Sequence, residues 1–209
     1  MKNILNNKKV IIFDLDGVLI NSVDFLKNYM KNKYEGMTDE DFKEIFLVNF
    51  WDGLNNFKKI AEKKYLIHHE VSKDNRASNN EIFLYKGVDK LVRDLAKKYI
   101  LVINSSDNEK FIIERLQHNN IIDFFDFVAG KETSLSKIEK FNFILKKYNV
   151  TNEEVVFVTD TVGDVVESEK MNIDYLAVTW GVHSEVDFKK RNFKNMTVLN
   201  KVSDFYLLL

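Results

Sequence analysis

The sequence predicts an α/β fold in which a parallel sheet is covered by helices on both faces and a small helical unit interrupts the pattern. Three observations predict it: short apolar runs recur along the chain, apolar residues at helical spacing separate them, and one long stretch shows helical spacing only. Runs that are apolar throughout are typical of parallel strands buried on both faces. Their alternation with helices favours a parallel sheet.

The first strand is expected at residues 10–13, and residues 22–85 after it contain no run typical of a strand. Thr38 and Asp41 have the spacing of a capping box at a helix start. We expect Trp51-Asp52-Gly53 to lie between two helices, either as a turn with Trp51 in a local core or as a loop that contacts a substrate. Apolar residues recur at helical spacing in three groups: Phe25, Leu26, Tyr29 and Met30; Phe42, Ile45, Phe46 and Phe50; Leu54, Phe57, Ile60 and Ala61.

The polar residues 71–80 are expected to form a mobile hinge through which the chain returns to the sheet. Further strands are expected at residues 100–103, 127–129, 155–158 and 176–178. Ser136 is the expected N-cap of the second of two helices in this part of the chain. The apolar faces of those helices are formed by Val88, Leu91, Val92 and Leu95, and by Ile138, Phe141, Ile144, Leu145 and Tyr148. These elements divide the chain into a Rossmann-like core, residues 1–20 and 86–209, and an inserted small α-helical cap, residues 21–85.

The composition limits the classes of protein to which the chain can belong. The 209 residues are 45% apolar, which suffices for a sizeable core and excludes a disordered chain. The formal net charge is −1, so no basic excess favours nucleic acid, and no apolar run is long enough to cross a membrane. Cysteine is absent, which excludes thiolate nucleophiles and cysteine-based zinc sites. The polar N-terminus lacks the apolar stretch of a signal peptide, so we expect a cytoplasmic protein.

Polar side chains follow the expected strands, at the edge of a parallel sheet where ligands bind. Carboxylates predominate among them, and a single acidic residue at such a position is more often a turn or helix-cap residue than a functional one. Several carboxylates that converge from separate strands, together with a lysine, favour a functional site. The candidates are Asp14, Asp16 and Gly17 after the first strand; Asn104, Ser105 and Ser106 after the second; Lys137 before a helix; and Asp160 and Asp164 after the fourth.

These motifs resemble those of the haloacid dehalogenase-like hydrolase superfamily over nearly the whole chain. Asp14-Leu15-Asp16-Gly17-Val18-Leu19 resembles its first motif, and Asp160-Thr161-Val162-Gly163-Asp164 its fourth. Residues 100–105 resemble the second motif and Lys137 the third, although Asn104 is an alternative to Ser105 as the second-motif residue. Residues 22–85 stand where the phosphoglycolate phosphatase-like branch inserts a helical cap. The resemblance implies hydrolysis of a small phosphorylated metabolite by a monomer or homodimer.

The residue types suit this chemistry. Asp14 can attack phosphorus and form an aspartyl-phosphate, while Asp16 can protonate the leaving alcohol and later deprotonate water. Mg²⁺ prefers oxygen ligands, and Asp14, the backbone carbonyl of Asp16 and Asp160 suit it, with Asp164 in a supporting role. Substrate oxygens would contact Gly17, Ser105, Ser106 and Lys137.

Two other functions remain open at this point. A sugar phosphomutase on the same scaffold would need a basic or histidine group in the cap, and Ile20-Asn21-Ser22 supplies none. A non-catalytic interaction protein that retains the fold would be favoured by loss of Asp14, Asp16 or Lys137, all of which are present. A dinucleotide-binding oxidoreductase is disfavoured, because the first strand is followed by carboxylates and not by Gly-x-Gly-x-x-Gly.

Overall fold

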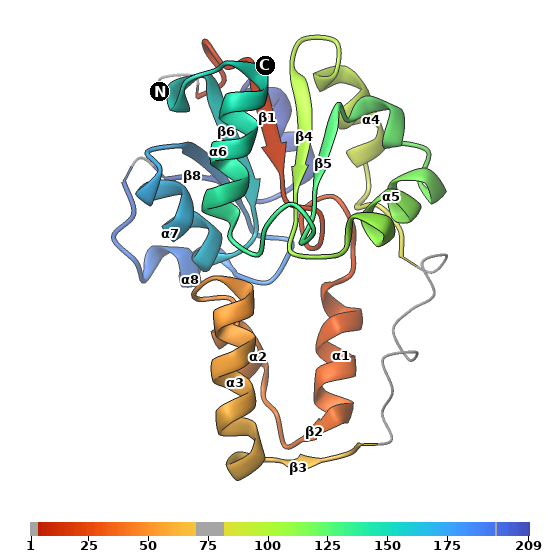
Figure 1. Ribbon diagram of the computed structural model, residues 1–209, viewed down its shortest axis with the longest axis vertical. Helices are drawn as coiled ribbons and strands as arrows, with labels where there is room; N and C mark the ends of the chain where they lie inside the picture. Colours follow the sequence, from red (N-terminus) through yellow and green to blue (C-terminus); the bar gives the residue numbers. More distant parts are fainter. Residues whose placement is uncertain (1–3, 70–81, 195) are drawn as a thin grey trace.

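A six-stranded parallel sheet forms the centre of the molecule. The computed structural model describes residues 4–69, 82–194 and 196–209, so the hinge expected at 71–80 lies outside the described residues. The strand order is β5-β4-β1-β6-β7-β8, which puts β1 in the middle of the sheet, between β4 and β6 (Figure 1). The strands are β1 (Val10–Phe13), β4 (Ile100–Asn104), β5 (Phe127–Ala129), β6 (Val155–Thr159), β7 (Asp174–Val178) and β8 (Thr197–Leu199).

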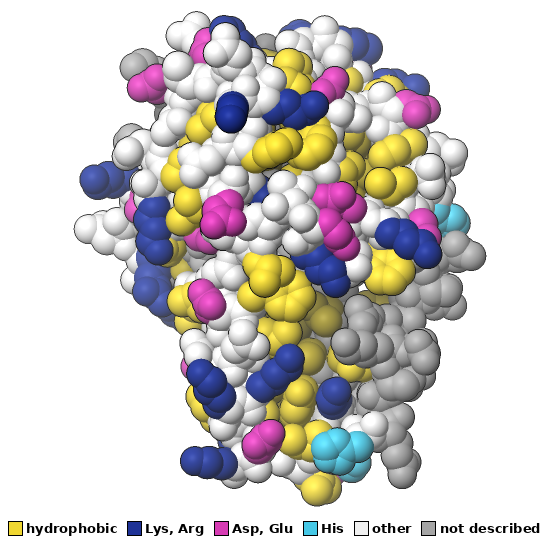
Figure 2. Space-filling view, in the orientation of Figure 1, with side chains coloured by type: hydrophobic (Ala, Val, Ile, Leu, Met, Phe, Trp, Pro, Cys, Tyr) yellow, Lys and Arg dark blue, Asp and Glu magenta, His cyan; other side chains and the backbone are white. Residues whose placement is uncertain are grey.

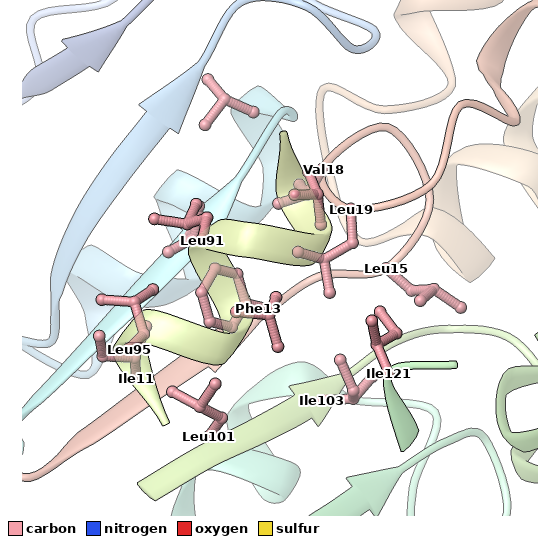
Figure 3. Close-up of a cluster of buried hydrophobic side chains, with 14 of the residues drawn as sticks. Ile11, Phe13, Leu15, Val18, Leu19, Leu91, Leu95, Leu101, Ile103 and Ile121 are labelled. Atoms are coloured by element: carbon pink, nitrogen blue, oxygen red, sulfur yellow. The ribbon is translucent and has the colours of Figure 1, made fainter. Parts of the chain in front are cut away.

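Alternate residues of β1 face two separate apolar clusters, because side chains alternate across a strand. Ile11 and Phe13 lie in the larger cluster together with Leu91 and Leu95 of α4 (Val88–Leu95), as Figure 3 shows. The same cluster takes side chains from α5 (Glu109–His118) and the short helix η5 (Val202–Leu207). Val10 and Ile12 face the opposite side, toward α6 (Lys137–Tyr148). Both faces of the sheet are therefore covered, as the uniformly apolar strands predicted.

Both faces at the far edge of the sheet are completed by the C-terminal elements. Val162 and Val165 of α7 (Val162–Lys170) pack with β7 and with Phe188 of α8 (Glu185–Lys189). The short helices η3 (Ile122–Phe124) and η4 (Asn152–Glu154) lead into β5 and β6. The five expected strands and the two expected helices are confirmed, and Ser136 caps α6 by accepting a hydrogen bond from the backbone N–H of Glu139. Strand β8 was not among the strands expected from the sequence.

The segment between β1 and α4 forms a separate group of helices in the lower half of Figure 1. It contains α1 (Val23–Lys33), α2 (Asp39–Glu44), α3 (Phe50–Lys64) and a two-stranded antiparallel pair, β2 (Tyr34–Glu35) and β3 (Leu66–Ile67). The two strands correct the expectation that this segment holds none. Its apolar cluster, which includes Phe42, Phe57 and Ala61, is separate from the clusters against the sheet. We call residues 23–67 the helical insertion.

Two details of the helical insertion differ from expectation. Thr38 and Asp41 form the predicted capping box, but α2 ends at Glu44, so Phe42 and Phe50 belong to different helices. Trp51-Asp52-Gly53 is the first turn of α3 and not a loop between helices, because Asn49 accepts a hydrogen bond from the N–H of Trp51 and starts the helix there. Across the described ranges, none of the helices is long and apolar enough to cross a membrane.

Candidate active site

Asp14 leaves the carboxyl end of the central strand and is held from several directions. Its backbone N–H donates to the carbonyl of Val158 at 2.9 Å, which continues the pairing of β1 with β6. Its Oδ1 accepts a hydrogen bond from the N–H of Leu15 at 2.8 Å. Burial raises the pKa of Asp14 to about 7, against the lowering effect of Lys137 and with a further rise from the charge of Asp164. The Asp14 carboxylate is therefore buried, and the positive charge of Lys137 does not fully offset the cost of burying its ionised form.

Lys137, the first residue of α6, connects two of these carboxylates. Its Nζ lies 2.9 Å from Asp14 Oδ2 and 2.6 Å from Asp164 Oδ2. The hydroxyl of Thr159 donates to the same oxygen of Asp164 at 2.7 Å. Burial favours the neutral amine, but Asp14 and Asp164 outweigh it and raise the pKa of Lys137 above its ordinary value. The side chain is therefore a buried cation, fixed by charge-assisted hydrogen bonds.

Asp160, directly after β6, is fully buried under two glycines. A Cβ on Gly17 would lie 2.0 Å from Asp160 Oδ2, and one on Gly181 would lie 2.2 Å from it. This oxygen accepts a hydrogen bond from the N–H of Val182 at 2.7 Å, whereas Oδ1 has no hydrogen-bond partner among the described residues. Burial, and then the charge of Asp14, raise the pKa of Asp160 well above its usual value. Oδ1 therefore has lone pairs that can coordinate a cation or accept a hydrogen bond from a bound molecule.

Asn104 and Ser105, the two candidates at the end of β4, have different surroundings. Asn104 is fully buried, its amide donates to the carbonyl of Lys137 at 3.5 Å, and it does not line the cavity described below. Ser105 and Ser106 both line that cavity. The Oγ of Ser105 accepts a hydrogen bond from the N–H of Asp107 at 3.1 Å, so its own proton remains to be donated. The arrangement favours Ser105 as the residue that contacts a ligand.

Asp16 lies further out than Asp14, with 36% of its side chain exposed. Its Oδ1 accepts hydrogen bonds from the hydroxyl of Ser22 at 2.6 Å and from Nη1 of Arg115 at 3.3 Å. The same Arg115 nitrogen contacts Asp107 Oδ2 at 2.9 Å. A carboxylate that is oriented yet open to a cavity can exchange protons with a bound molecule.

These residues line a cavity of about 430 Å³ between the edge of the sheet and the helical insertion. All of the candidate residues except Gly17 and Asn104 line it: Asp14, Asp16, Ser105, Ser106, Lys137, Asp160 and Asp164. Gly17 lies behind it, against Asp160. The topology explains the gathering, because β4, β1 and β6 are adjacent and parallel, so that their carboxyl ends meet.

Two cations of the site were missed by the sequence analysis. Arg115 comes from α5, where it lies next to the apolar Ile112 and Leu116. An arginine on an apolar helix face was the available signal. Lys140, one turn after Lys137, is fully buried and donates to the carbonyl of Ser105. Burial and the charge of Lys137 lower the pKa of Lys140 to about 8.

The oxygen-rich donor set suits a hard cation, since Mg²⁺ prefers carboxylate and carbonyl oxygens. Asp160 Oδ1 is orphaned, and a cation beside Asp14 and Asp160 would lower the pKa of both. Within the described residues, no three carboxylate, histidine or cysteine side chains form an ion site by themselves. A cation here therefore also needs a backbone carbonyl or water. Asp164 Oδ2 is already taken by Lys137 and Thr159.

Comparison with known proteins places this arrangement in a family. Phosphoglycolate phosphatase from Vibrio vulnificus (strain CMCP6) is 24% identical over 209 residues, which cover 86% of this chain and 90% of that protein. The phosphoglycolate phosphatase of Colwellia psychrerythraea is 24% identical over 207 residues, 89% of this chain and 91% of that protein.

Solved structures share the fold. A haloacid dehalogenase-like family hydrolase from Streptococcus pneumoniae superposes with a TM-score of 0.76 at 17% identity, covering 97% of this chain and 99% of that one. A predicted phosphoglycolate phosphatase from Haemophilus somnus superposes with a TM-score of 0.74 at 17% identity, covering 97% and 98%. The profile of the family described as haloacid dehalogenase-like hydrolase matches residues 11–178, from β1 to the end of β7. This protein therefore belongs to the haloacid dehalogenase-like hydrolase family.

Proposed function

We propose that the protein hydrolyses a small phosphate monoester through an aspartyl-phosphate formed on Asp14. The observation that carries the proposal is the buried Lys137 ammonium, 2.9 Å from the Asp14 carboxylate, at the floor of a cavity large enough for a small metabolite. A cation in that position offsets the charge of an approaching phosphate. The names of the relatives, phosphoglycolate phosphatases at 24% identity, support the same class of reaction.

The two chemical steps use two aspartates. The Asp14 carboxylate attacks phosphorus, the ester P–O bond breaks, and protonated Asp16 gives its proton to the leaving alkoxide, so that the alcohol departs neutral. Asp16 then removes a proton from water, which attacks the phosphorus of the aspartyl-phosphate and releases phosphate and free Asp14. Ser22 and Arg115 both donate to Oδ1 of Asp16, so they would keep its carboxyl oriented in both steps.

The substrate phosphate would lie between the loop after β4 and the start of α6. Ser105 donates its hydroxyl proton to a phosphate oxygen, Ser106 borders the same space, and Lys137 neutralises part of its charge. Gly17, proposed from the sequence to contact the substrate, would act from behind through its contact with Asp160. Lys140 holds the carbonyl of Ser105 and so fixes the loop from behind.

Magnesium is the cofactor we propose. Asp14, Asp160 and the backbone carbonyl of Asp16 would hold it, with Asp164 in a supporting or water-mediated position. When bound, the ion supplies positive charge beside the phosphoryl group and helps to orient it. The orphaned oxygen of Asp160 is the observation that supports this assignment.

The helical insertion is proposed to act as a cap over the site, with residues 21–85 as its extent and residues 1–20 and 86–209 as the core. Its helices supply one wall of the cavity, and its contacts with α7 and α8 seat it beside the carboxyl edge of the sheet. A cap in this position excludes bulk water from the aspartyl-phosphate until the leaving alcohol has left.

The proposal is tested with a panel of phosphate monoesters, measured with Mg²⁺, with EDTA, and with Asp14→Asn. We expect Mg²⁺-dependent phosphate release that Asp14→Asn lowers by roughly a thousandfold or more. Asp89→Asn, an exposed carboxylate in the first turn of α4, is the matched control and should retain activity. Absence of phosphate release from every monoester by folded protein would reject the proposal.

A further inference from the structure

The wall of the cavity opposite the carboxylates is apolar and aromatic. It is formed by side chains of the helical insertion, among them Phe25, Tyr29, Phe46, Phe50, Trp51 and Leu54. Hydrophobic side chains gather in the lower half of Figure 2, between α3 and α1, below a belt that contains acidic and basic groups. The site is therefore divided: charged groups at the sheet edge face an apolar surface on the insertion.

The rings of this wall form a connected group. Phe46 and Phe50 are stacked with centroids 5.6 Å apart, and Phe50 meets Trp51 edge to face at 5.4 Å. None of the three is fully buried, although all three line the cavity. Phe25 of α1 also lines the cavity and is 38% exposed. Partly exposed rings in a cavity wall offer flat surfaces for a planar group.

Trp51 carries an additional signal. Its indole Nε1 is buried and has no hydrogen-bond partner in the described part of the chain. A buried indole N–H without an acceptor is uncommon in proteins, since such groups are normally paired. The backbone around it is closely fitted, because a Cβ on Gly53 would lie 1.9 Å from the carbonyl oxygen of Ile45. Trp51 therefore lines the cavity with a closely fitted ring whose buried N–H is unpaired in the described part of the chain.

The size of the cavity also exceeds what a phosphorylated two-carbon acid requires. A volume of about 430 Å³ falls within the range of roughly 300–1,000 Å³ found for sites that enclose ligands of drug size. A small acid in this space would cover the charged floor and leave the rings of the insertion in contact with water.

We propose that the leaving alcohol of the preferred substrate carries an aromatic ring, which stacks on the wall formed by Phe46, Phe50 and Trp51. This inference rests on the proposed phosphatase function and specifies its substrate class. Such a substrate would bind its phosphate at the charged floor and a heteroaromatic ring at the wall. A nucleoside monophosphate and a phosphorylated pyridine alcohol both have these two parts.

Lys58 and Lys131 also line the cavity, whereas two of its other cations already have partners. Arg115 is held between Asp16 and Asp107. The ammonium of Lys33 lies 5.9 Å from the ring centroids of both Tyr29 and Tyr34, so it interacts with π faces.

The test compares phosphate monoesters with and without an aromatic ring on the leaving alcohol. Adenosine and cytidine 5′-monophosphates are measured against ribose 5-phosphate, with phosphoglycolate and pyridoxal 5′-phosphate alongside, all with Mg²⁺ and wild-type protein. Base–aromatic stacking predicts a kcat/KM for a ring-bearing substrate about tenfold or more above that of ribose 5-phosphate. The nucleotide and pyridoxal arms identify which source of the ring is preferred.

Variants locate the effect. Trp51→Leu keeps an apolar side chain but removes the ring and its N–H, and we expect it to lower the ratio of ring-bearing to ring-free kcat/KM about tenfold. Phe143→Leu, an exposed ring on α6 outside the cavity, is the matched control and should leave the ratio unchanged.

The outcomes separate this inference from the proposed function. Equal or higher kcat/KM for ribose 5-phosphate or phosphoglycolate would overturn the aromatic leaving group and leave the phosphatase standing. A preference for ring-bearing substrates that Trp51→Leu does not reduce would overturn the assignment of the wall. If no monoester releases phosphate, the proposed function fails and this inference fails with it.

Discussion

At the residue scale, the most constrained position of the site is Gly17. Its φ is +77°, a left-handed conformation that favours glycine, and a Cβ there would lie 2.0 Å from Asp160 Oδ2. We expect Gly17→Ala to lower kcat/KM by about a hundredfold and to cost on the order of 1–3 kcal/mol of unfolding free energy, because Asp160 must move. Phosphate-release kinetics and chemical denaturation measure the two effects.

Gly36 supplies the matched control. Its φ is +89°, but the nearest atom to an added Cβ, on Tyr65, is 4.0 Å away. Gly36→Ala therefore has the backbone strain without the collision and should lose stability while retaining activity. Equal losses of activity in the two variants would contradict the role given to the contact between Gly17 and Asp160.

His183 makes stability depend on pH. Its Nδ1 accepts a hydrogen bond from the N–H of Val162 at 3.2 Å, so the neutral ring carries its proton on Nε2. Burial is the main cause that lowers the pKa of His183 to about 4 from 6.5. Between these values the unfolded chain binds more protons, so the unfolding free energy decreases as pH falls from about 6.5 to about 4. The contribution is at most about 3 kcal/mol.

Denaturant titrations between pH 7 and pH 4 check this prediction. His183→Gln offers a side-chain oxygen to the N–H of Val162 without a titrating group, so its stability should change less with pH over this range. A wild-type curve that is no steeper than that of the variant would show that His183 does not titrate as expected.

Individual site residues could be predicted from the sequence where they directly follow a strand. Asp14, Ser105 and Asp160 directly follow β1, β4 and β6, and the parallel order of the strands brings them together. Arg115 could not be placed in this way, because its contact with Asp16 depends on how α5 lies against the loop after β1. Helical spacing gives a face of a helix but not the neighbour that the face meets.

At the element scale, the segment between α2 and α3 joins the helical insertion to the core. The N–H of Gly163 in α7 donates to the carbonyl of Phe46 at 2.8 Å, and a Cβ on Gly163 would lie 2.2 Å from the carbonyl oxygen of Val48. Asn49 adds a hydrogen bond from its amide to Glu167 at 3.3 Å. The start of α3, with Trp51 on it, is thus positioned by contacts with α7.

The substitution Gly163→Ala tests this contact between the helical insertion and α7. Alanine in place of glycine inside a helix ordinarily stabilises by about 1 kcal/mol, but here the added methyl meets backbone that must move. We expect lower stability and a KM raised several-fold for the best substrate, since the wall that carries Trp51 shifts. Lys170→Ala, an exposed position in the same helix, should leave KM unchanged. A more stable Gly163→Ala protein with normal KM would contradict the claim that contacts with α7 position the start of α3.

The elements themselves differ in how far sequence predicts them. The buried strands were recognisable because they are apolar on both faces, as at residues 10–13 and 155–158. The break between α2 and α3 was missed, because apolar spacing runs on through Phe46 and Phe50 although the backbone leaves the helix at Ile45. The strand β8 was missed because an edge strand of three residues has too short a pattern.

At the scale of the whole molecule, the fold concentrates negative charge at one edge of its sheet. Asp14, Asp160 and Asp164 are all buried there, and Lys137 is the cation in direct contact with two of them. Like charges in a buried site oppose folding unless a cation or a proton neutralises them. Burial first, and then the charges of neighbouring carboxylates, raise the pKa values of Asp14 and Asp160.

Mg²⁺ should therefore act on stability as well as on activity. An ion that binds only the folded protein at a hundred times its dissociation constant adds about 2.7 kcal/mol to the unfolding free energy. For a chain of this size that raises the melting temperature by roughly 5–10 °C. Thermal unfolding in MgCl₂, against NaCl of equal ionic strength, measures the specific effect.

Asp160→Asn distinguishes the ion from general screening. Its side-chain oxygen can still accept the hydrogen bond from Val182, while the buried negative charge is gone. Without Mg²⁺ the variant should be more stable than wild type, by on the order of 1 kcal/mol, and Mg²⁺ should then raise its melting temperature little. If Mg²⁺ stabilises both proteins equally, the ion binds elsewhere and the assignment of Asp160 is wrong. If the variant is less stable at every Mg²⁺ concentration, the carboxylate stabilises the fold, and repulsion at the sheet edge does not limit stability.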